Sequence, residues 1–221
     1  MKKLLKYLGI GILALVLFIL VKTFTLSQKT VEVAAVTPIE VTDEALVRLQ
    51  KAIQFKTISY SYTSKPDSIE FTGLHNYLAS AFPLVDSLLE KKTIQYSLLY
   101  KWTGTDSSLK PILLMSHLDV VPVDDGTLKD WEAPPFSGEI KNGNIYGRGT
   151  MDDKVSVLAI LEAVETSLRN GVSPKRTIYL AFGHDEEIGG EQGAGSMAKY
   201  LQEQGVNFEY IIDEGGEIAE G

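Results

Sequence analysis

The chain has 221 residues, of which 44% are hydrophobic, 9% aromatic and 23% charged, a balance that is typical of a globular protein and excludes global disorder. Its formal net charge of −8 argues against a nucleic-acid partner, because phosphate binding requires a basic surface. The sequence contains no cysteine, so disulfides and thiolate ligands are excluded and any metal must be held by His, Asp or Glu.

The N-terminal segment, residues 1–26, has the character of a targeting or anchoring sequence. Lys2, Lys3 and Lys6 precede an uncharged, almost wholly apolar run at residues 8–21. This run is shorter than the roughly 20 residues of a full membrane span, but its apolar neighbours extend it if the lysines reach the interface. A cleaved signal peptide with secretion is the alternative. Without a small-residue cleavage site directly after the run, we predict an uncleaved membrane anchor with the body outside the cytoplasm.

Residues 27–42 are polar and β-branched without periodicity, which predicts a linker between the membrane and the globular part, residues 43–221. The globular part begins near Thr42, where an acidic first turn leads into apolar residues at helical spacing. We expect a first helix there and a second helix over residues 71–89.

The apolar pattern then changes from helical spacing to short runs. Sheet strands are predicted first and an alternation of helices and strands after them. This order predicts an α/β fold with a mostly parallel sheet flanked by helices, in which ligands gather at the carboxyl ends of the strands. The expected strands are 93–100, 112–116, 177–182 and 208–212, and the expected helices are 155–168 and 196–204.

Polar residues stand at these strand ends. His117 and Asp119 follow strand 112–116, and a metal-bound histidine usually needs an acceptor such as Asp119 at its second nitrogen. Asp152 and Asp153 come just before helix 155–168. Asp153 fits a helix N-cap, whereas the glycines upstream of Asp152 would let its carboxylate approach and bridge two metals.

Two further acidic motifs end strands 177–182 and 208–212. Glu186 and Glu187 point different ways, so one can bind a metal while the other handles the proton of a bound water; a solvated acidic loop is the alternative. Asp213 ends the last strand with glycine behind it, and His184 is expected to have a structural hydrogen-bonding role. Together these strand ends predict a metal site on one rim of the sheet.

The motifs occur in a fixed order along the chain. They are His117-x-Asp119-Val120-Val121-Pro122, Trp131-Glu132-x-Pro134-Pro135-Phe136-Ser137-Gly138, Tyr146-Gly147-Arg148-Gly149-Thr150-x-Asp152-Asp153-Lys154, Gly183-His184-Asp185-Glu186-Glu187 and Asp213-Glu214-Gly215-Gly216. In this combination residues 43–221 resemble the zinc aminoacylase and glutamate carboxypeptidase family of metallopeptidases. The resemblance is closest to its carboxypeptidase S and N-acyl-amino-acid synthase/hydrolase branch.

The resemblance implies a dizinc exopeptidase-type catalytic domain that cleaves a peptide or N-acyl amide bond next to a free carboxylate. Two Zn ions are implied as cofactors, with Co or Mn also compatible with the donor types. The implied roles are zinc binding by His117 and Asp213, bridging by Asp152, binding of the second zinc by Glu187, general base catalysis by Glu186 and orientation of His117 by Asp119.

The chain departs from the family pattern in one respect. The family's second zinc takes a further His near the end of a much longer chain, and a lid domain inserted after the Asp213 region supplies dimer contacts. Residues 43–221 are therefore expected to be the N-terminal part of the catalytic domain and inactive alone. A small peptide or N-acyl amino acid is the expected substrate. The sequence leaves the oligomeric state open, with a homodimer through the lid as one option.

Two alternatives from other classes compete with this interpretation. A metal-binding but non-catalytic module is disfavoured for the whole protein because Glu186 is intact. A calcium-stabilised surface domain is suggested by Asp124, Asp125 and Asp130, but their spacing lacks the terminal bidentate Glu of a calcium loop. The glycines match neither a phosphate loop nor a dinucleotide fingerprint.

Overall fold

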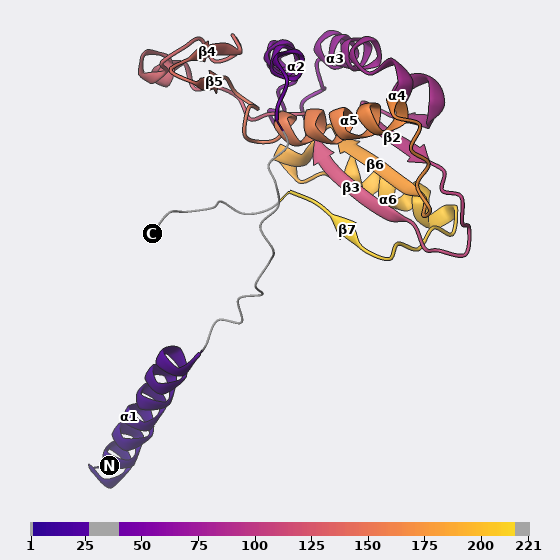
Figure 1. Cartoon of the computed structure of the whole chain (residues 1–221). Coiled ribbons are helices and arrows are strands. Elements are labelled where there is room, and N and C mark those ends of the chain that lie inside the picture. Colours follow the sequence, from indigo (N-terminus) through magenta and orange to yellow (C-terminus); the bar gives the residue numbers. More distant parts are fainter. Residues whose placement is uncertain (1, 27–39, 215–221) are drawn as a thin grey trace. The chain divides into compact units, whose positions relative to one another are not determined.

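The computed structural model describes residues 2–26 and 40–214 (Figure 1). The chain divides into two units, residues 1–40 and 41–221, which are described separately. In the first unit, helix α1 (Lys2–Thr25) exposes all its residues and is long and apolar enough to cross a membrane, by length and composition. The predicted linker lies outside the described residues except at its C-terminal end.

The second unit is built on a five-stranded sheet of order β1-β2-β6-β3-β7. Its strands are β1 (Glu90–Ile94), β2 (Ser97–Trp102), β3 (Ile112–His117), β6 (Ile178–Gly183) and β7 (Ile211–Ile212). Strand β3 pairs in parallel with both β6 and β7, while β1 and β2 add an antiparallel edge. The predicted α/β fold is confirmed, with the parallel strands confined to the half of a mixed sheet that carries the strand-end motifs.

Two predicted elements were wrong because a turn or break inside them was missed. The single strand predicted at 93–100 is a hairpin of β1 and β2, turned at Gln95 with a positive φ of 53°. The helix predicted at 71–89 is two helices, α3 (Ser68–Ala81) and α4 (Pro83–Leu88). Pro83 starts the second helix because proline has no N–H to continue the first.

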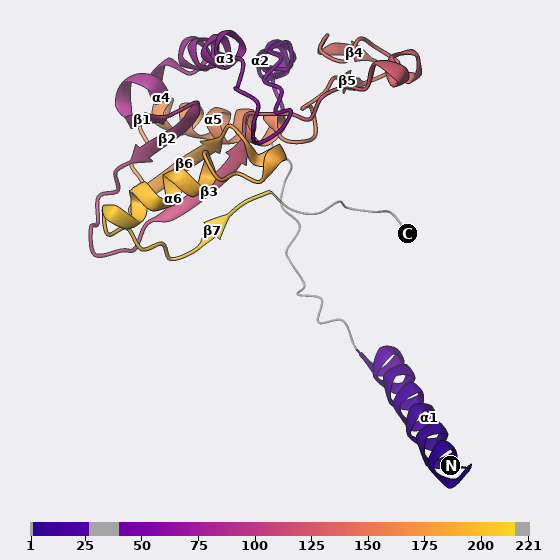
Figure 2. The ribbon, with the colours of Figure 1, turned by 180° about the vertical axis from the view of Figure 1, so that it is seen from behind.

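Helices cover both faces of the sheet (Figures 1 and 2). The core on one face combines α2 (Asp43–Ile53), α3, α4 and α5 (Lys154–Arg169). Helix α6 (Ala194–Glu203) covers the other face. Successive strand residues point to opposite faces, so Leu180 and Phe182 pack in the α5 core, and Ala181 packs with Met197 of α6. The short elements are η1 (Asp125–Asp130), β4 (Glu139–Lys141), β5 (Asn144–Tyr146) and η2 (Glu186–Ile188).

The chain path makes the carboxyl end of β3 a topological switch point. After β3 the chain passes through α5 on one face and returns as β6 on one side of β3. After β6 it passes through α6 on the other face and returns as β7 on the other side of β3. The loops that follow β6 and β7 therefore flank the end of β3, the place where open α/β sheets bind ligands.

Candidate metal centre

His117, the last residue of β3, is the centre of the predicted site. Its side chain is only 2% exposed. Nδ1 lies 3.0 Å from the main-chain oxygen of Asp119 and 3.3 Å from its carboxylate. Nε2 lies 2.8 Å from Oδ1 of Asp152 and 3.5 Å from Oε2 of Glu214. One ring nitrogen is thus held by Asp119, and the other faces a group of acidic side chains.

Two overlapping groups of side chains converge on Nε2. Each offers ligand atoms that lie within 4.8 Å of one another. The first group, the β3–α5 triad, is His117, Asp152 and Glu187; the second, the β7 triad, is His117, Glu186 and Glu214. One imidazole with several carboxylates is a donor set that fits divalent ions such as zinc, cobalt or manganese. The residues present therefore fit the metals implied by the resemblance.

Asp152 is carried on the turn that leads into α5. Its side chain is 69% exposed. The turn can approach β3 because Gly149 has φ +82°, and a Cβ there would lie 2.6 Å from Cγ1 of Val120. Asp153 occupies the N-cap position but makes no side-chain cap hydrogen bond; its buried carboxylate accepts from Oγ of Ser116 at 2.7 Å. The predicted capping role of Asp153 was wrong, since its carboxylate fastens the turn to β3.

Lys154 is a structural residue of the site that sequence reasoning did not single out. Its side chain is 1% exposed, and Nζ donates to the carbonyl oxygens of Ala52 at 3.2 Å and Phe55 at 2.7 Å. Burial lowers the pKa of Lys154 to about 7. The ammonium group ties the start of α5 to the end of α2, and so holds the backbone next to Asp152.

The loop after β6 brings in Glu186 and Glu187. Asp119, which is 0% exposed, accepts the backbone N–H of Glu186 at 3.0 Å and of Glu187 at 3.2 Å. Oε1 of Glu187 accepts the N–H of Val121 at 3.2 Å. Burial, together with the charge of Asp152, raises the pKa of Glu187 to about 7. Asp119 therefore connects the buried histidine with the loop that carries both glutamates.

The charge of His117 balances this acidic cluster. Burial alone would lower its pKa, but the hydrogen bond and charge of Asp119, the hydrogen bond to Asp152 and the charge of Glu214 raise it to about 10. Without metal, the imidazole is therefore protonated at neutral pH. A metal ion that binds Nε2 takes the place of this proton.

The end of β7 differs from expectation. Asp213 belongs to neither triad, and its Oδ1 accepts the N–H of Glu214 at 2.9 Å. The carboxylate of Glu214 faces His117 instead, and its pKa is raised by burial. Both residues follow β7, which ends at Ile212, and only Glu214 is placed within reach of Nε2 of His117. The sequence predicted Asp213 as the ligand from this motif, whereas in the structure the neighbouring Glu214 lies with His117.

His184 lies outside the ligand groups. Nδ1 lies 2.7 Å from Oγ of the buried Ser97, and the ring packs edge-on against Phe71 and Tyr96. Burial lowers the pKa of His184. A buried, neutral ring with this hydrogen bond agrees with the structural role expected from the sequence.

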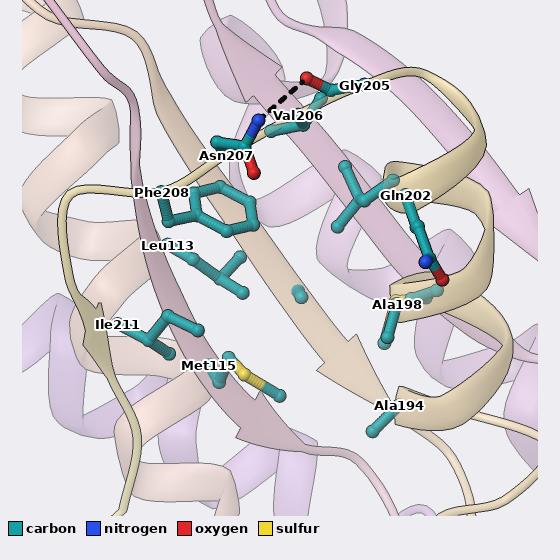
Figure 3. Close-up of a pocket in the computed structure, with 13 residues that line it drawn as sticks. Leu113, Met115, Ala194, Ala198, Gln202, Gly205, Val206, Asn207, Phe208 and Ile211 are labelled. Atoms are coloured by element: carbon teal, nitrogen blue, oxygen red, sulfur yellow. Dashed lines mark hydrogen bonds between the residues drawn. The ribbon is translucent and has the colours of Figure 1, made fainter.

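A separate pocket between α6 and strands β3 and β7 is apolar (Figure 3). Met115, Phe208 and Ile211 point into it, and none of its lining residues is ionisable. It therefore offers neither metal ligands nor acid–base groups, and the candidate metal centre is the cluster at the end of β3.

An α/β domain with one buried histidine and several carboxylates at a switch point belongs to the class of carboxylate–histidine metal-binding domains. Residues 113–221 match the sequence profile of Peptidase family M20/M25/M40. The chain is a member of this family, whose peptidases are metal dependent, and the resemblance predicted from the motifs is confirmed.

Two relatives and one solved structure illustrate the likeness. The chain is 46% identical over 223 residues to "Probable carboxypeptidase S-like 2" of Dictyostelium discoideum, which covers 97% of this chain and 42% of the relative. It is 44% identical over 176 residues to "N-fatty-acyl-amino acid synthase/hydrolase PM20D1" of Mus musculus, which covers 78% of this chain and 34% of the relative. The chain therefore spans less than half the length of these relatives.

The crystal structure of human carnosine dipeptidase 1 superposes with a TM-score of 0.63 at 21% identity, covering 79% of this chain and 38% of that one. At this identity the likeness concerns the fold alone. It confirms that the mixed sheet flanked by helices is the family fold.

Proposed function

We propose that this chain carries the metal centre of a membrane-anchored hydrolase that cleaves a peptide or N-acyl amide bond next to a free carboxylate. The observation that carries the proposal is the convergence of His117 with Asp152, Glu186, Glu187 and Glu214 at the switch point of the sheet. The relatives named as carboxypeptidase S-like and as N-fatty-acyl-amino acid synthase/hydrolase support small peptides or N-acyl amino acids as substrates.

Two zinc ions are the proposed cofactors, with cobalt or manganese as substitutes. His117, a bridging Asp152 and Glu187 would hold them, together with Glu214 or Asp213 from the end of β7. When bound, such a metal pair supplies polarisation of the amide carbonyl and lowers the pKa of the attacking water.

Glu186 is the proposed general base. Its side chain is 51% exposed and its Oε2 lies 3.9 Å from Nε2 of His117, so it can meet solvent and substrate beside the ligands. The carboxylate would accept the proton of the attacking water and then donate it to the leaving amine. Asp119 contacts both His117 and the backbone of Glu186, and would hold the two residues in a fixed relative position during this proton transfer.

The proposal also covers helix α1 and the part of the relatives that this chain does not match. Helix α1 would hold the protein in a membrane, with the body outside the cytoplasm, or would act as a cleaved signal sequence. Because the chain covers 42% of its Dictyostelium relative, we propose that full activity, and a homodimer, need the remaining part of such a protein. The 221-residue chain alone would then be a metal-binding, catalytically inactive module.

The test uses the chain in detergent micelles, alone and extended by the unmatched C-terminal part of the Dictyostelium relative. Metal content and the hydrolysis of dipeptides and N-acyl amino acids are measured for both forms. In the extended form, Glu186→Gln should keep its metal and lose about 10²–10⁴-fold in turnover. Asp152→Ala should lose metal as well, while Glu191→Gln, the same change in the same loop, should behave as wild type.

Each outcome bears on a different step of the proposal. Full turnover in Glu186→Gln would refute the general-base assignment. Wild-type chains that bind no metal in either form would refute the metal centre itself.

A further inference from the structure

The loop that carries Glu186 and Glu187 is fastened at both ends by buried carboxylates. At its start, Asp119 accepts the backbone N–H groups of both glutamates. At its end, Asp185 accepts the N–H of Gln192 through Oδ2 at 2.7 Å and the N–H of Gly193 through Oδ1 at 2.8 Å. The two carboxylates together leave the intervening backbone little freedom.

Asp185 closes this loop on itself. It is the residue directly before Glu186, and its side chain reaches across to the last residues of the loop. Its main-chain oxygen also accepts the N–H of Ile188 at 3.2 Å and of Gly190 at 2.8 Å. With only 4% of its surface exposed, Asp185 is an ionisable group that keeps its hydrogen bonds away from water.

The closure is tight at Gly193. A Cβ on this residue would lie 2.4 Å from Oδ1 of Asp185, 3.0 Å from the backbone nitrogen of His184 and 3.0 Å from Oγ of Ser97. Ser97 is 0% exposed and His184 is 1% exposed, and the two side chains are hydrogen-bonded to each other. These neighbours are buried and hydrogen-bonded and cannot move aside, so only glycine fits at position 193.

Within the described part of the chain, the hydrogen bonds of Asp185 go to backbone N–H groups and not to the side chain of either glutamate. Its influence on Glu186 and Glu187 therefore passes through the backbone that joins them to Gly193. We propose that Asp185 is a positioning residue: its carboxylate, closed against Gly193, sets the direction in which Glu186 and Glu187 present their carboxylates. This inference rests on the proposed roles of the two glutamates as base and ligand.

The first experiment measures loop closure in the metal-free full chain in detergent micelles. In Asp185→Asn, one oxygen remains for one amide and an NH₂ group meets the other. Amide hydrogen exchange followed by mass spectrometry should then be at least about tenfold faster across 186–193, with exchange in α5 unchanged. Gly193→Ala should loosen the same peptide by steric conflict, and Asp106→Asn, in an exposed loop, should exchange as wild type.

The second experiment measures the effect on the ligands with Co²⁺, whose visible absorption responds to coordination geometry. Asp185→Asn should bind as many Co²⁺ ions per chain as wild type, with an altered absorption band and an affinity lowered about 10–100-fold, the range seen when groups that orient ligands are removed. Asp106→Asn should leave both band and affinity unchanged.

The outcomes separate the inference from the proposed function. Unchanged exchange in both Asp185→Asn and Gly193→Ala refutes the closure. Faster exchange with a wild-type Co²⁺ band and affinity refutes positioning and leaves Asp185 a purely structural residue. A wild-type chain that binds no Co²⁺ refutes the metal centre, and with it the role of Asp185 toward a ligand, even where the exchange result supports the closure.

Discussion

Replacing Asp119 tests how much of the site depends on one buried carboxylate. Asp119 is 0% exposed, accepts the N–H groups of Glu186 and Glu187, and lies 3.3 Å from Nδ1 of His117. Asp119→Asn keeps the shape but removes the charge, and turns one acceptor oxygen into an NH₂ group. One backbone N–H then faces a second donor in a buried position, where hydrogen bonds cannot be replaced by water.

The size of the effect follows from these contacts. A hydrogen bond to a charged acceptor contributes about 1.5–3 kcal/mol, and one of the two amide bonds is lost while the other is weakened. We expect the unfolding free energy of the metal-free chain to fall by about 2–4 kcal/mol. Because His117 also loses the anion that orients its ring, we expect zinc affinity to fall about 10–100-fold.

Urea unfolding in micelles, followed by tryptophan fluorescence, measures the first quantity, and calorimetric titration with zinc measures the second. Asp106→Asn is the matched control, because its carboxylate also accepts a backbone N–H, from Ser108, but in an exposed loop. Asp119→Asn with wild-type stability and zinc affinity would show that the buried hydrogen bonds do not support the site, and would refute this reasoning.

Three further predictions concern protonation, the β7 end and a helix outside the site. The pKa of His117 is raised from 6.5 to about 10, so its contribution to the stability of the metal-free chain is complete below pH 6.5 and is lost as pH rises through 10. Zinc binding at pH 8 should therefore release about one proton from His117, as measured by the pH change of a weakly buffered solution. Below pH 7, zinc binding should release a second proton, from Glu187. If Glu214 is the metal ligand at the end of β7, Glu214→Ala should weaken the binding of a second metal ion and Asp213→Ala should not. Titration calorimetry measures both affinities, and the reverse result would favour Asp213, the ligand implied by the family resemblance. Glu165→Ala removes the buried acceptor of two backbone N–H groups at the start of α4, and should lower the free energy of unfolding in urea by about 2–4 kcal/mol. An unchanged denaturation midpoint would show that Glu165 does not stabilise the start of this helix.

The fold was predictable where one periodicity ran uninterrupted. Strands β3 and β6 and helix α5 were predicted to within a few residues, because each buries an apolar run or stripe. The β1–β2 hairpin was missed because its turn carries Gln95, which takes a positive φ without the usual glycine or asparagine signal. The break between α3 and α4 had a signal in Pro83, which starts a helix readily but does not continue one.

The site was predictable to the extent that parallel strands end at one edge. His117, Asp152 and Glu187 were expected together, and they form one group. What escaped prediction depends on contacts between distant segments. Lys154 is fixed by carbonyl groups about 100 residues earlier in the chain, and Asp153 by Ser116, a partner that no local pattern indicates.

The two triads share Nε2 of His117, so only one of them can hold a metal ion at a time. They also differ in how firmly this chain supports them, and both facts predict the metal stoichiometry. The β3–α5 triad rests on the inner strand β3, on the turn fastened by Asp153 and Lys154, and on the loop held by Asp119. The β7 triad depends on Glu214, which follows a strand of two residues, Ile211 and Ile212, that are both more than half exposed.

A ligand that follows an exposed strand loses more conformational entropy when a metal binds, because fewer contacts hold its backbone beforehand. We therefore expect the 221-residue chain to bind one zinc ion tightly, through the β3–α5 triad. A second ion would have to bind at the end of β7 without Nε2 of His117, so we expect its affinity to be at least about 100-fold lower. Zinc titration with elemental analysis after dialysis measures this directly. Two ions bound with equal affinity would mean that the end of β7 is as well supported as the end of β3, and that a complete dimetal centre forms within this chain.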